Sequence, residues 1–251
     1  MIAVISDIHA NYEALSRVLD EIEELGADQI ICLGDVVGYG PEPEQCIDAV
    51  RAKCDVVLCG NHDFAVVYGA DDFRASAAQA INYHRERLMP RMDQTAEDDV
   101  RRQRWDFLKG LPFRYTTSGY LFVHGSPRNP RHEYLRERDI RWRLDDKMEQ
   151  SFALFRKMCF VGHTHRPGVF TDEFEYYSPQ ELDGVYRPEE GVKSIVNVGS
   201  VGQPRDGDPK SSFATVEEDD TVRWHRVSYD LEATVKKMER VGTYILDGAE
   251  R

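Results

Sequence analysis

Imidazole, carboxylate and amide side chains recur at the ends of short apolar runs over the first two-thirds of the chain. Each run is continuously apolar, which is typical of a strand buried on both faces. The set of donors contains no thiolate. The polar residues are, in chain order, Asp7 and His9 in SDIH, Asp35 in LGD, Asn61, His62 and Asp63 in GNHD, His124 in VHG, and His163 and His165 in GHTH.

This set of donors suits Zn, Mn, Fe, Co or Ni better than Ca²⁺, which prefers an all-oxygen cage. The donors are too many for one tetrahedral ion. They are enough for two divalent ions about 3.5–4 Å apart, the spacing of hydrolytic two-metal sites. A carboxylate can bridge two cations, and Asp35 lies in the middle of the set.

Strands and helices alternate over the first sixty residues, which predicts parallel strands joined by crossovers. Residues 2–6 predict a buried strand. Residues 11–26 have apolar positions at helical spacing, with Asn11 as the N-cap and Gly26 as the stop. A second strand in QIICLGD, a helix opened by proline in PEPEQCIDAVRAK and a third strand in DVVLCGNHD follow.

The arrangement of the predicted strands indicates where the donors meet. If the strands share one sheet, the polar clusters converge beyond its carboxyl edge, where open α/β sheets bind ligands. Residues two apart project to the same side of an extended segment. We therefore expect Asp7 with His9, and His163 with His165, to act as pairs.

The rest of the chain predicts a helical, highly charged segment at 70–110 and two strands about a turn at Ser118-Gly119. Residues 128–157 are rich in charge and predict an insertion of one or two helices. Strands follow in GVFTDEFEYY and KSIVNVGS, then a hairpin with EEDD at its tip and a final amphipathic helix, LEATVKKMERV. Because no repeat or linker interrupts the chain, we expect residues 1–251 to form a single domain.

The formal net charge of −13 and the pI near 5.1 exclude some classes of partner. They argue against broad nucleic-acid binding and against docking on an anionic membrane. They do not exclude a phosphate substrate at a site with its own cations. Five scattered cysteines read as reduced thiols, and neither a signal peptide nor a membrane-length apolar run is present, so we expect a cytoplasmic protein.

The ordered blocks D-x-H, G-D, G-N-H-D, V-H-G and G-H-T-H resemble the calcineurin-like metallophosphoesterase superfamily. The resemblance implies an α/β fold in which a two-sheet β-sandwich is flanked by helices, with a dimetal site at the strand ends. It implies that His62 is a catalytic general acid rather than a metal ligand. It also implies two ligand sets, one of Asp7, His9, Asp35 and His165, the other of Asp35, Asn61, His124 and His163.

The resemblance implies hydrolysis of a phosphate ester or anhydride. The pKa of a metal-bound water falls from 15.7 to roughly 7, so hydroxide is available to attack phosphorus in line with the leaving oxygen. The cations stabilise the developing charge, and His62 protonates the leaving group. Asp63 is expected to orient either His62 or the neighbouring loop.

The chain differs from the protein-phosphatase branch, whose G-D block continues as G-D-x-x-D-R-G. Gly38 and Tyr39 stand where that branch has the acid and the arginine that support the catalytic histidine and grip phosphate. The stretches GDVVGYGPEP and NVGSVGQPRDGDPKSSFAT instead resemble a prokaryotic subgroup of predicted phosphoesterases, some of whose relatives act on diadenosine polyphosphates. Arg205 in the second stretch could donate to phosphoryl oxygens, or could be a surface arginine in an ordinary turn.

We therefore expect a dimetal phosphoesterase that acts on a small nucleotide-like substrate, either a phosphodiester or a phosphoanhydride. A phosphatase for monoesters or phosphoproteins and an inactive metal-binding scaffold are the alternatives. His84, His132 and His225 have no partner block, and we expect packed or solvated side chains there. The sequence leaves the metal, the physiological substrate and the oligomeric state open.

Overall fold

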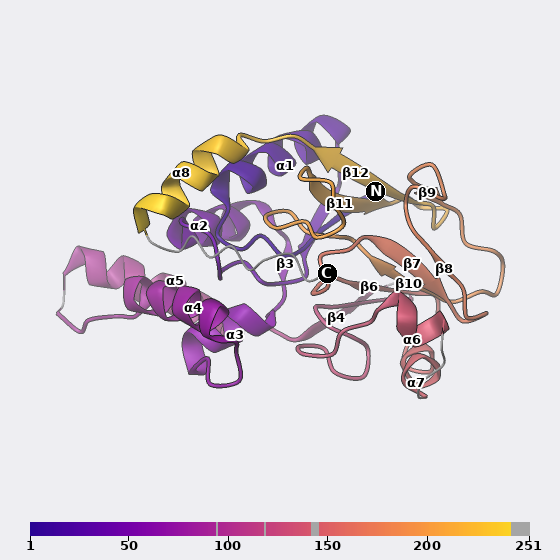
Figure 1. Cartoon of the computed structure of the whole chain (residues 1–251), viewed down its shortest axis with the longest axis horizontal. Coiled ribbons are helices and arrows are strands. Elements are labelled where there is room, and N and C mark those ends of the chain that lie inside the picture. The colour runs from indigo at the N-terminus through magenta and orange to yellow at the C-terminus, as the bar shows by residue number, and fades with distance from the viewer. Residues whose placement is uncertain (94, 118, 142–145, 242–251) are drawn as a thin grey trace.

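The computed structural model describes residues 1–93, 95–117, 119–141 and 146–241. These residues form two six-stranded β-sheets that pack face to face, with helices against their outer faces (Figure 1). The predicted two-sheet sandwich flanked by helices is confirmed. The assignment of the whole chain to one domain stays a prediction, and Ser118 of the predicted turn lies outside the described residues.

The first sheet contains the parallel strands that the alternating pattern predicts. β1 (Ile2–Ile5) pairs in parallel with β2 (Gln29–Cys32) and in antiparallel with β11 (Ser211–Val216). Helices α1 (Tyr12–Leu25) and α2 (Pro43–Lys53) make the crossovers. The order of strands is β3-β2-β1-β11-β12-β9, where β3 is Val56–Val57, β12 is Val222–Val227 and β9 is Val185–Tyr186.

The second sheet has the order β4-β5-β6-β10-β7-β8. Its centre is parallel, since β6 pairs in parallel with both β5 and β10, and its two edges are antiparallel hairpins. The strands are β4 (Arg114–Thr117), β5 (Tyr120–Val123), β6 (Met158–Val161), β10 (Ser194–Asn197), β7 (Gly168–Thr171) and β8 (Tyr176–Tyr177).

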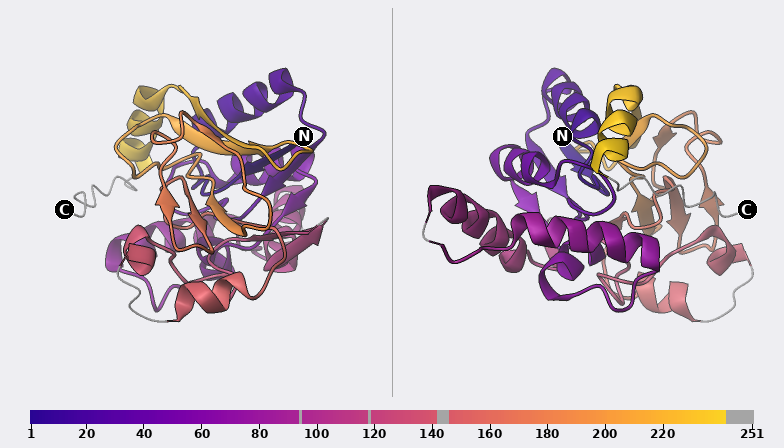
Figure 2. Two further views of the ribbon diagram at one scale, coloured as in Figure 1. Left: turned by 90° about the vertical axis from the view of Figure 1, so that its right-hand side faces the viewer. Right: turned by 60° about the vertical axis from the view of Figure 1, so that its left-hand side comes forward.

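The helices fall into three groups (Figure 2). α1 and α2 lie on the first sheet with α8 (Leu231–Val241) packed beside α1, and α6 (Glu137–Arg141) and α7 (Lys147–Phe152) lie on the second. The third group, at one end of the sandwich, is α3 (Asn61–Tyr68), α4 (Ala75–Leu88) and α5 (Ala96–Gly110). No described helix is long and apolar enough to cross a membrane.

Three apolar layers hold these elements together, and alternation along each strand divides its side chains between two of them. On β1, Ala3 and Ile5 face the helices while Val4 faces the second sheet. On β6, Phe160 faces the first sheet and Cys159 faces the side of α6 and α7. Burial on both faces explains why these strands are continuous apolar runs in the sequence.

One element differs from its prediction in a way that matters for the site. The third strand, expected to run through DVVLCGNHD, is only Val56–Val57, and Asn61 begins helix α3. The carboxylate of Asp63 in the first turn accepts a hydrogen bond from the Gly60 N–H at 3.0 Å. Such a bond is a helix-start interaction, so the polar residues of GNHD belong to a helix N-terminus rather than to a strand end.

Candidate metal centre and active site

The predicted donors lie at the ends of strands from both sheets, not of one sheet. Asp7 and His9 follow β1, Asp35 follows β2 and Asn61 begins the helix after β3, all in the first sheet. His124 follows β5 of the second sheet, and two further histidines, His163 and His165, follow its β6. The donors converge because the rims of the two sheets meet, and all seven are at most 6% exposed.

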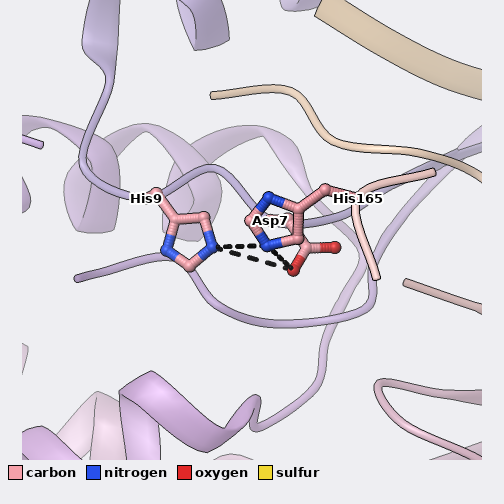
Figure 3. A group of neighbouring side chains, drawn as sticks. All are labelled: Asp7, His9 and His165. Carbon is pink, nitrogen blue, oxygen red and sulfur yellow. Dashed lines mark hydrogen bonds and ion pairs between the residues drawn. The ribbon is translucent and has the colours of Figure 1, made fainter. Parts of the chain in front are cut away.

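Asp7, His9 and His165 form a first cluster (Figure 3). Nε2 of His9 and Nε2 of His165 face each other at 3.1 Å. The Oδ1 atom of Asp7 lies 3.1 Å from Nε2 of His165 and 3.7 Å from Nε2 of His9. Three ligating atoms from two sheets thus surround one point.

Asp35, His124 and His163 form a second cluster, with Asn61 beside it. Nε2 of His124 lies 3.1 Å from Nδ1 of His163, 3.1 Å from Oδ1 of Asn61 and 3.3 Å from Oδ2 of Asp35. The same Oδ2 atom of Asp35 lies 3.7 Å from Nε2 of His9 in the first cluster. Asp35 therefore stands between the two clusters, as expected of a bridging carboxylate.

The pairing of His163 with His165 is wrong, because the two rings belong to different clusters. The prediction assumed an extended backbone, but both residues have a left-handed conformation, with φ of 63° and 59°. Asp7, His9 and Asp35 are also left-handed. Such backbone costs of order 1–3 kcal/mol per non-glycine residue and concentrates at functional sites. The directions of the donor side chains are therefore set by the turns after β1, β2 and β6, and not by the alternation of side chains along the strands.

The spacing of the ligating atoms fits a bound cation. Donors about 2.1 Å from one cation lie about 3.0 Å apart at right angles and about 3.4 Å apart at the tetrahedral angle. The contacts of 3.1 Å between imidazole nitrogens, one in each cluster, have this separation. Oδ1 of Asp7 has no hydrogen-bond partner among the described residues although it is buried. A divalent cation would satisfy this oxygen and the two nitrogen lone pairs that face each other between His9 and His165.

The pKa values of the imidazoles agree with this fit. Burial lowers the pKa of His163 to about 3 and that of His9 well below its usual value, so both rings are neutral. Neutral imidazole is the form that coordinates a metal. Burial also acts to lower the pKa of His124, but the charge of Asp35 outweighs it and raises this pKa to about 9. A proton on His124 thus offsets the buried carboxylate, a task that a cation would take over.

His62 lies against both clusters and is 4% exposed. Its ring centroid is 4.7 Å from that of Tyr39, 4.9 Å from that of His9 and 5.0 Å from that of Phe73. Its backbone N–H donates to Oδ1 of Asp35 at 2.8 Å, while its ring Nδ1 has no hydrogen-bond partner among the described residues. A ligating atom of His62 also lies close to those of His9 and Asp35, so geometry alone permits either a ligand or a catalytic role.

Asp63 contacts the backbone of the neighbouring loop, the second of its two predicted roles. Its carboxylate accepts hydrogen bonds from the N–H groups of Asp35 at 2.7 Å, Gly60 at 3.0 Å and Val37 at 3.1 Å. Burial and the charge of Asp35 raise the pKa of Asp63 to about 7, and the hydrogen bonds from Gly60 and Val37 oppose that rise. Asp63 therefore fixes the turn that carries Asp35, and not the ring of His62.

Arg205 is exposed at the mouth of the site, and its backbone N–H donates to the carbonyl of His165 at 3.1 Å. Its guanidinium carbon lies 5.8 Å from the ring centroid of Tyr39. In the same segment, Gly202 approaches the carbonyl of Ile8 so closely that a Cβ atom would overlap it. This glycine serves the packing of the turn after β1, whereas the exposed guanidinium of Arg205 donates to Oε1 of Gln203 at 2.6 Å.

Two aromatic residues lie at the site although the sequence does not predict them as site residues. Tyr39 stood out only as a departure from a motif, yet its ring contacts both His9 and His62. Tyr134 comes from the loop after β5, and its ring stacks on His163 with 3.8 Å between centroids. Neither belongs to a block of metal donors, so only the folded structure brings them to the site. Asn11 caps α1 as predicted, accepting from the Ala14 N–H at 3.1 Å.

A helix-flanked sandwich of two mixed sheets, with buried carboxylates and imidazoles at the common rim, is the architecture of metallophosphoesterases. The calcineurin-like phosphoesterase superfamily domain matches residues 1–221, and the chain belongs to this superfamily. The structure of a metallophosphoesterase from Sphaerobacter thermophilus is similar, with a TM-score of 0.77 and 35% identity, covering 96% of this chain and 93% of that one.

Two archaeal proteins extend the comparison. Uncharacterized protein MJ0912 of Methanocaldococcus jannaschii is 33% identical over 246 residues, which are 95% of this chain and 91% of that protein. Hypothetical protein PH1004 from Pyrococcus horikoshii OT3 shares the fold, with a TM-score of 0.73 at 21% identity, covering 97% of this chain and 95% of that one. The likeness to both runs along almost the whole chain.

Proposed function

We propose that the protein is a dimetal-dependent phosphoesterase that hydrolyses a phosphodiester or phosphoanhydride bond in a small nucleotide-like substrate. The observation that supports it best is the pair of donor clusters on either side of Asp35, each built from both sheets. Membership of the calcineurin-like phosphoesterase superfamily supports the class of reaction.

The chain's own residues divide into holders of cations and groups that act on the substrate. One ion would be held by Asp7, His9, Asp35 and His165, and the other by Asp35, Asn61, His124 and His163. Bound divalent cations would lower the pKa of a water and neutralise charge on phosphoryl oxygens. The buried donors exclude bulk solvent, which strengthens every electrostatic interaction at the site.

His62 would carry the proton that the leaving oxygen needs. Its ring touches both clusters through His9 and Asp35, and Tyr39 and Phe73 restrict its movement. General acids of this kind contribute about 10²–10⁴-fold to a rate. Its position beside the donors His9 and Asp35 is the observation that supports this role.

Arg205, Tyr39 and Tyr134 support the choice of substrate class. The guanidinium can donate in parallel to phosphoryl oxygens, and it approaches the metal centre from its exposed side. The two tyrosines bring aromatic surface to the donor residues His9 and His163. A phosphate joined to an aromatic base would match a site that combines cations, an arginine and aromatic rings.

The test is hydrolysis by metal-stripped protein that is re-supplied with Mn, Ni, Co, Zn or Mg. The substrates are p-nitrophenyl phosphate, bis-p-nitrophenyl phosphate and diadenosine tetraphosphate. We expect metal-dependent cleavage of the diester and the tetraphosphate, with slower turnover of the monoester. Arg205→Ala should raise KM about tenfold or more, while Arg223→Ala, an exposed arginine on β12, should leave KM unchanged.

Each alternative gives a different result. A preference for the monoester would replace the proposed substrate class with that of a phosphomonoesterase. Absence of hydrolysis of every substrate by protein with two bound ions per chain would favour a catalytically inactive scaffold. A stoichiometry of one ion per chain would contradict the dimetal arrangement.

A further inference from the structure

His84 on α4 is fully buried and uses both ring nitrogens to hold one loop. Nδ1 accepts a hydrogen bond from the backbone N–H of Gly38 at 2.9 Å, and Nε2 lies 2.8 Å from the carbonyl oxygen of Gly40. A backbone N–H can only donate and a carbonyl can only accept. The ring is therefore the neutral tautomer with its proton on Nε2, and burial keeps it so by lowering its pKa to about 3.

The loop that His84 holds, residues 38–40, touches the catalytic candidate and the first donor cluster directly. Gly38 lies so close to the ring of His62 that a Cβ atom there would overlap Nδ1. Gly40 donates its N–H to the carbonyl of His9 at 2.9 Å, and a Cβ atom at Gly40 would overlap that oxygen. Between them, the ring of Tyr39 contacts the rings of His62 and His9.

The backbone of this loop is strained, so contacts from outside the loop are needed to keep its conformation. Gly38 has φ of 97° and Tyr39 has φ of 58°, the latter a conformation that costs a non-glycine residue about 1–3 kcal/mol. Such a conformation persists only where surrounding contacts determine it. The two bonds from His84 span Tyr39 on either side, so they fix the segment in which the strain lies.

The ring of His62 depends on this loop for its orientation. No hydrogen bond fixes its Nδ1 among the described residues, and its side chain is held by Gly38, Tyr39 and Phe73. Gly38 and Tyr39 occupy the two places where the protein-phosphatase branch has its acid and arginine. In this chain Gly38 and Tyr39 therefore pack against His62 at the two places where that branch has charged side chains.

We propose that His84 is a positioning residue, which orients His62 through the loop of Gly38, Tyr39 and Gly40. The inference rests on the proposed function, since it assigns His84 an effect on the reaction of His62. His84 does not touch the donor side chains and is not a ligand. Its loss should therefore change turnover rather than the binding of metal.

The experiment is a double-mutant cycle with His62→Ala and His84→Ala on the metal-loaded, full-length protein. We expect His84→Ala to lower kcat about 10- to 100-fold, because a misplacement of about 1 Å at a catalytic group costs up to 10²-fold. KM should change less than threefold, and the number of metal ions bound per chain should stay the same. In the His62→Ala background, adding His84→Ala should cost less than twofold, because the two residues then act as one unit.

A second readout does not need activity. The ring signals of ¹⁵N-labelled histidine, assigned through single substitutions, should show His62 displaced in His84→Ala. The signal of His225, which bonds Thr215 far along the first sheet, should stay in place. His225→Ala is the matched control, and we expect it to leave kcat unchanged.

The outcomes separate the two proposals. If His84→Ala lowers kcat by the same factor with and without His62, His84 acts generally on the structure and the positioning role is overturned. An unchanged kcat, or loss of metal in His84→Ala, would overturn it as well. If the wild-type protein hydrolyses no phosphoester, the proposed function fails, and the inference then stands or falls on whether the His62 signal moves.

Discussion

Neighbouring residues of the GNHD block act on different parts of the centre. Asn61 contributes an oxygen to the second donor cluster, while His62 places its ring against Tyr39 and Phe73. Asp63 accepts three backbone N–H groups and so shapes the turn of Asp35. A helix start allows this division, because consecutive side chains on a helix point about 100° apart.

This division predicts different phenotypes for His62 and Asp35. His62→Ala should leave the metal content unchanged and lower kcat by about 10²–10⁴-fold, as expected for the loss of a general acid. Asp35→Ala should lower metal content and activity together, because its Oδ2 lies between the two clusters. Metal analysis of the purified variants beside kcat would check this. A His62→Ala protein that has lost metal, beside an Asp35→Ala protein that keeps it, would reverse the two roles.

At the level of elements, the sequence predicts the strands of the sandwich well and the turns poorly. Buried strands such as β1 and β6 are short apolar runs, so their place in the chain is visible in the sequence. β3 is shorter than its apolar run, because helix α3 begins at Asn61. The left-handed turns that separate His163 from His165 leave no periodic signal, since single φ values do not affect hydrophobic spacing.

The donor residues could be found from the sequence because they stand in ordered blocks at the ends of predicted strands. His84 and Tyr134 could not, because each reaches the site from an element that contains no donor. His84 lies in a helix whose place beside the loop of residues 38–40 depends on tertiary packing. Residues of this kind are identified by contacts across long sequence separations, which one sequence does not contain.

Helix α8, at the end of the described chain, contacts residues in and beside the turns near the site. Lys237 contacts the carboxylates of both Glu13 at the start of α1 and Glu42 beside α2. Thr234, on the same helix, donates to the side chain of Asn11 at 3.1 Å. One cation therefore separates two half-buried carboxylates, and burial together with the neighbouring Glu13 raises the pKa of Glu42.

Lys237→Ala should destabilise the protein more at pH 7.5 than at pH 4.5. At pH 7.5 both Glu13 and Glu42 are ionised, so removal of the lysine leaves two facing negative charges. Near pH 4.5 the raised pKa of Glu42 lets it take up a proton, which relieves the repulsion. We expect a loss of about 1 kcal/mol at pH 7.5, after allowance for the partial exposure of Lys237.

Urea unfolding at the two pH values measures this difference. Lys236→Ala is the matched control on the same helix, since Lys236 is exposed and forms an ion pair with the exposed Glu232. Its effect should be below about 0.5 kcal/mol at either pH. Equal losses for Lys237→Ala at both pH values would contradict the role of the two carboxylates.

At the scale of the whole molecule, the candidate metal centre lies where the rims of the two sheets meet. The first cluster combines Asp7 and His9 of the first sheet with His165 of the second. The second cluster combines Asp35 with His124 and His163 in the same way. A ligand bound at this rim contacts both sheets, so its binding free energy adds to the stability of their assembly.

Removal of metal should therefore lower the melting temperature of the whole protein. Binding at a free concentration 1,000 times the Kd stabilises a fold by about 4 kcal/mol, which is about 8–16 °C for a chain of this size. Calorimetry of protein with added Mn²⁺ or with EDTA would measure the shift. Equal melting temperatures under the two conditions would show that the rim does not bind the ion, and restored melting on adding metal back would exclude an effect of the chelator itself.

The cross-sheet origin of the donors also sets an order of events during synthesis. His163 and His165 follow Asn61 by ~100 residues, which a ribosome takes roughly 5–20 s to add. Until then Asp7 and Asp35 have left the ribosome without the imidazoles that complete either cluster. If the clusters bind metal as proposed, loading would be a late step of maturation, and the ions available in the cell at that moment would determine which metal the protein acquires.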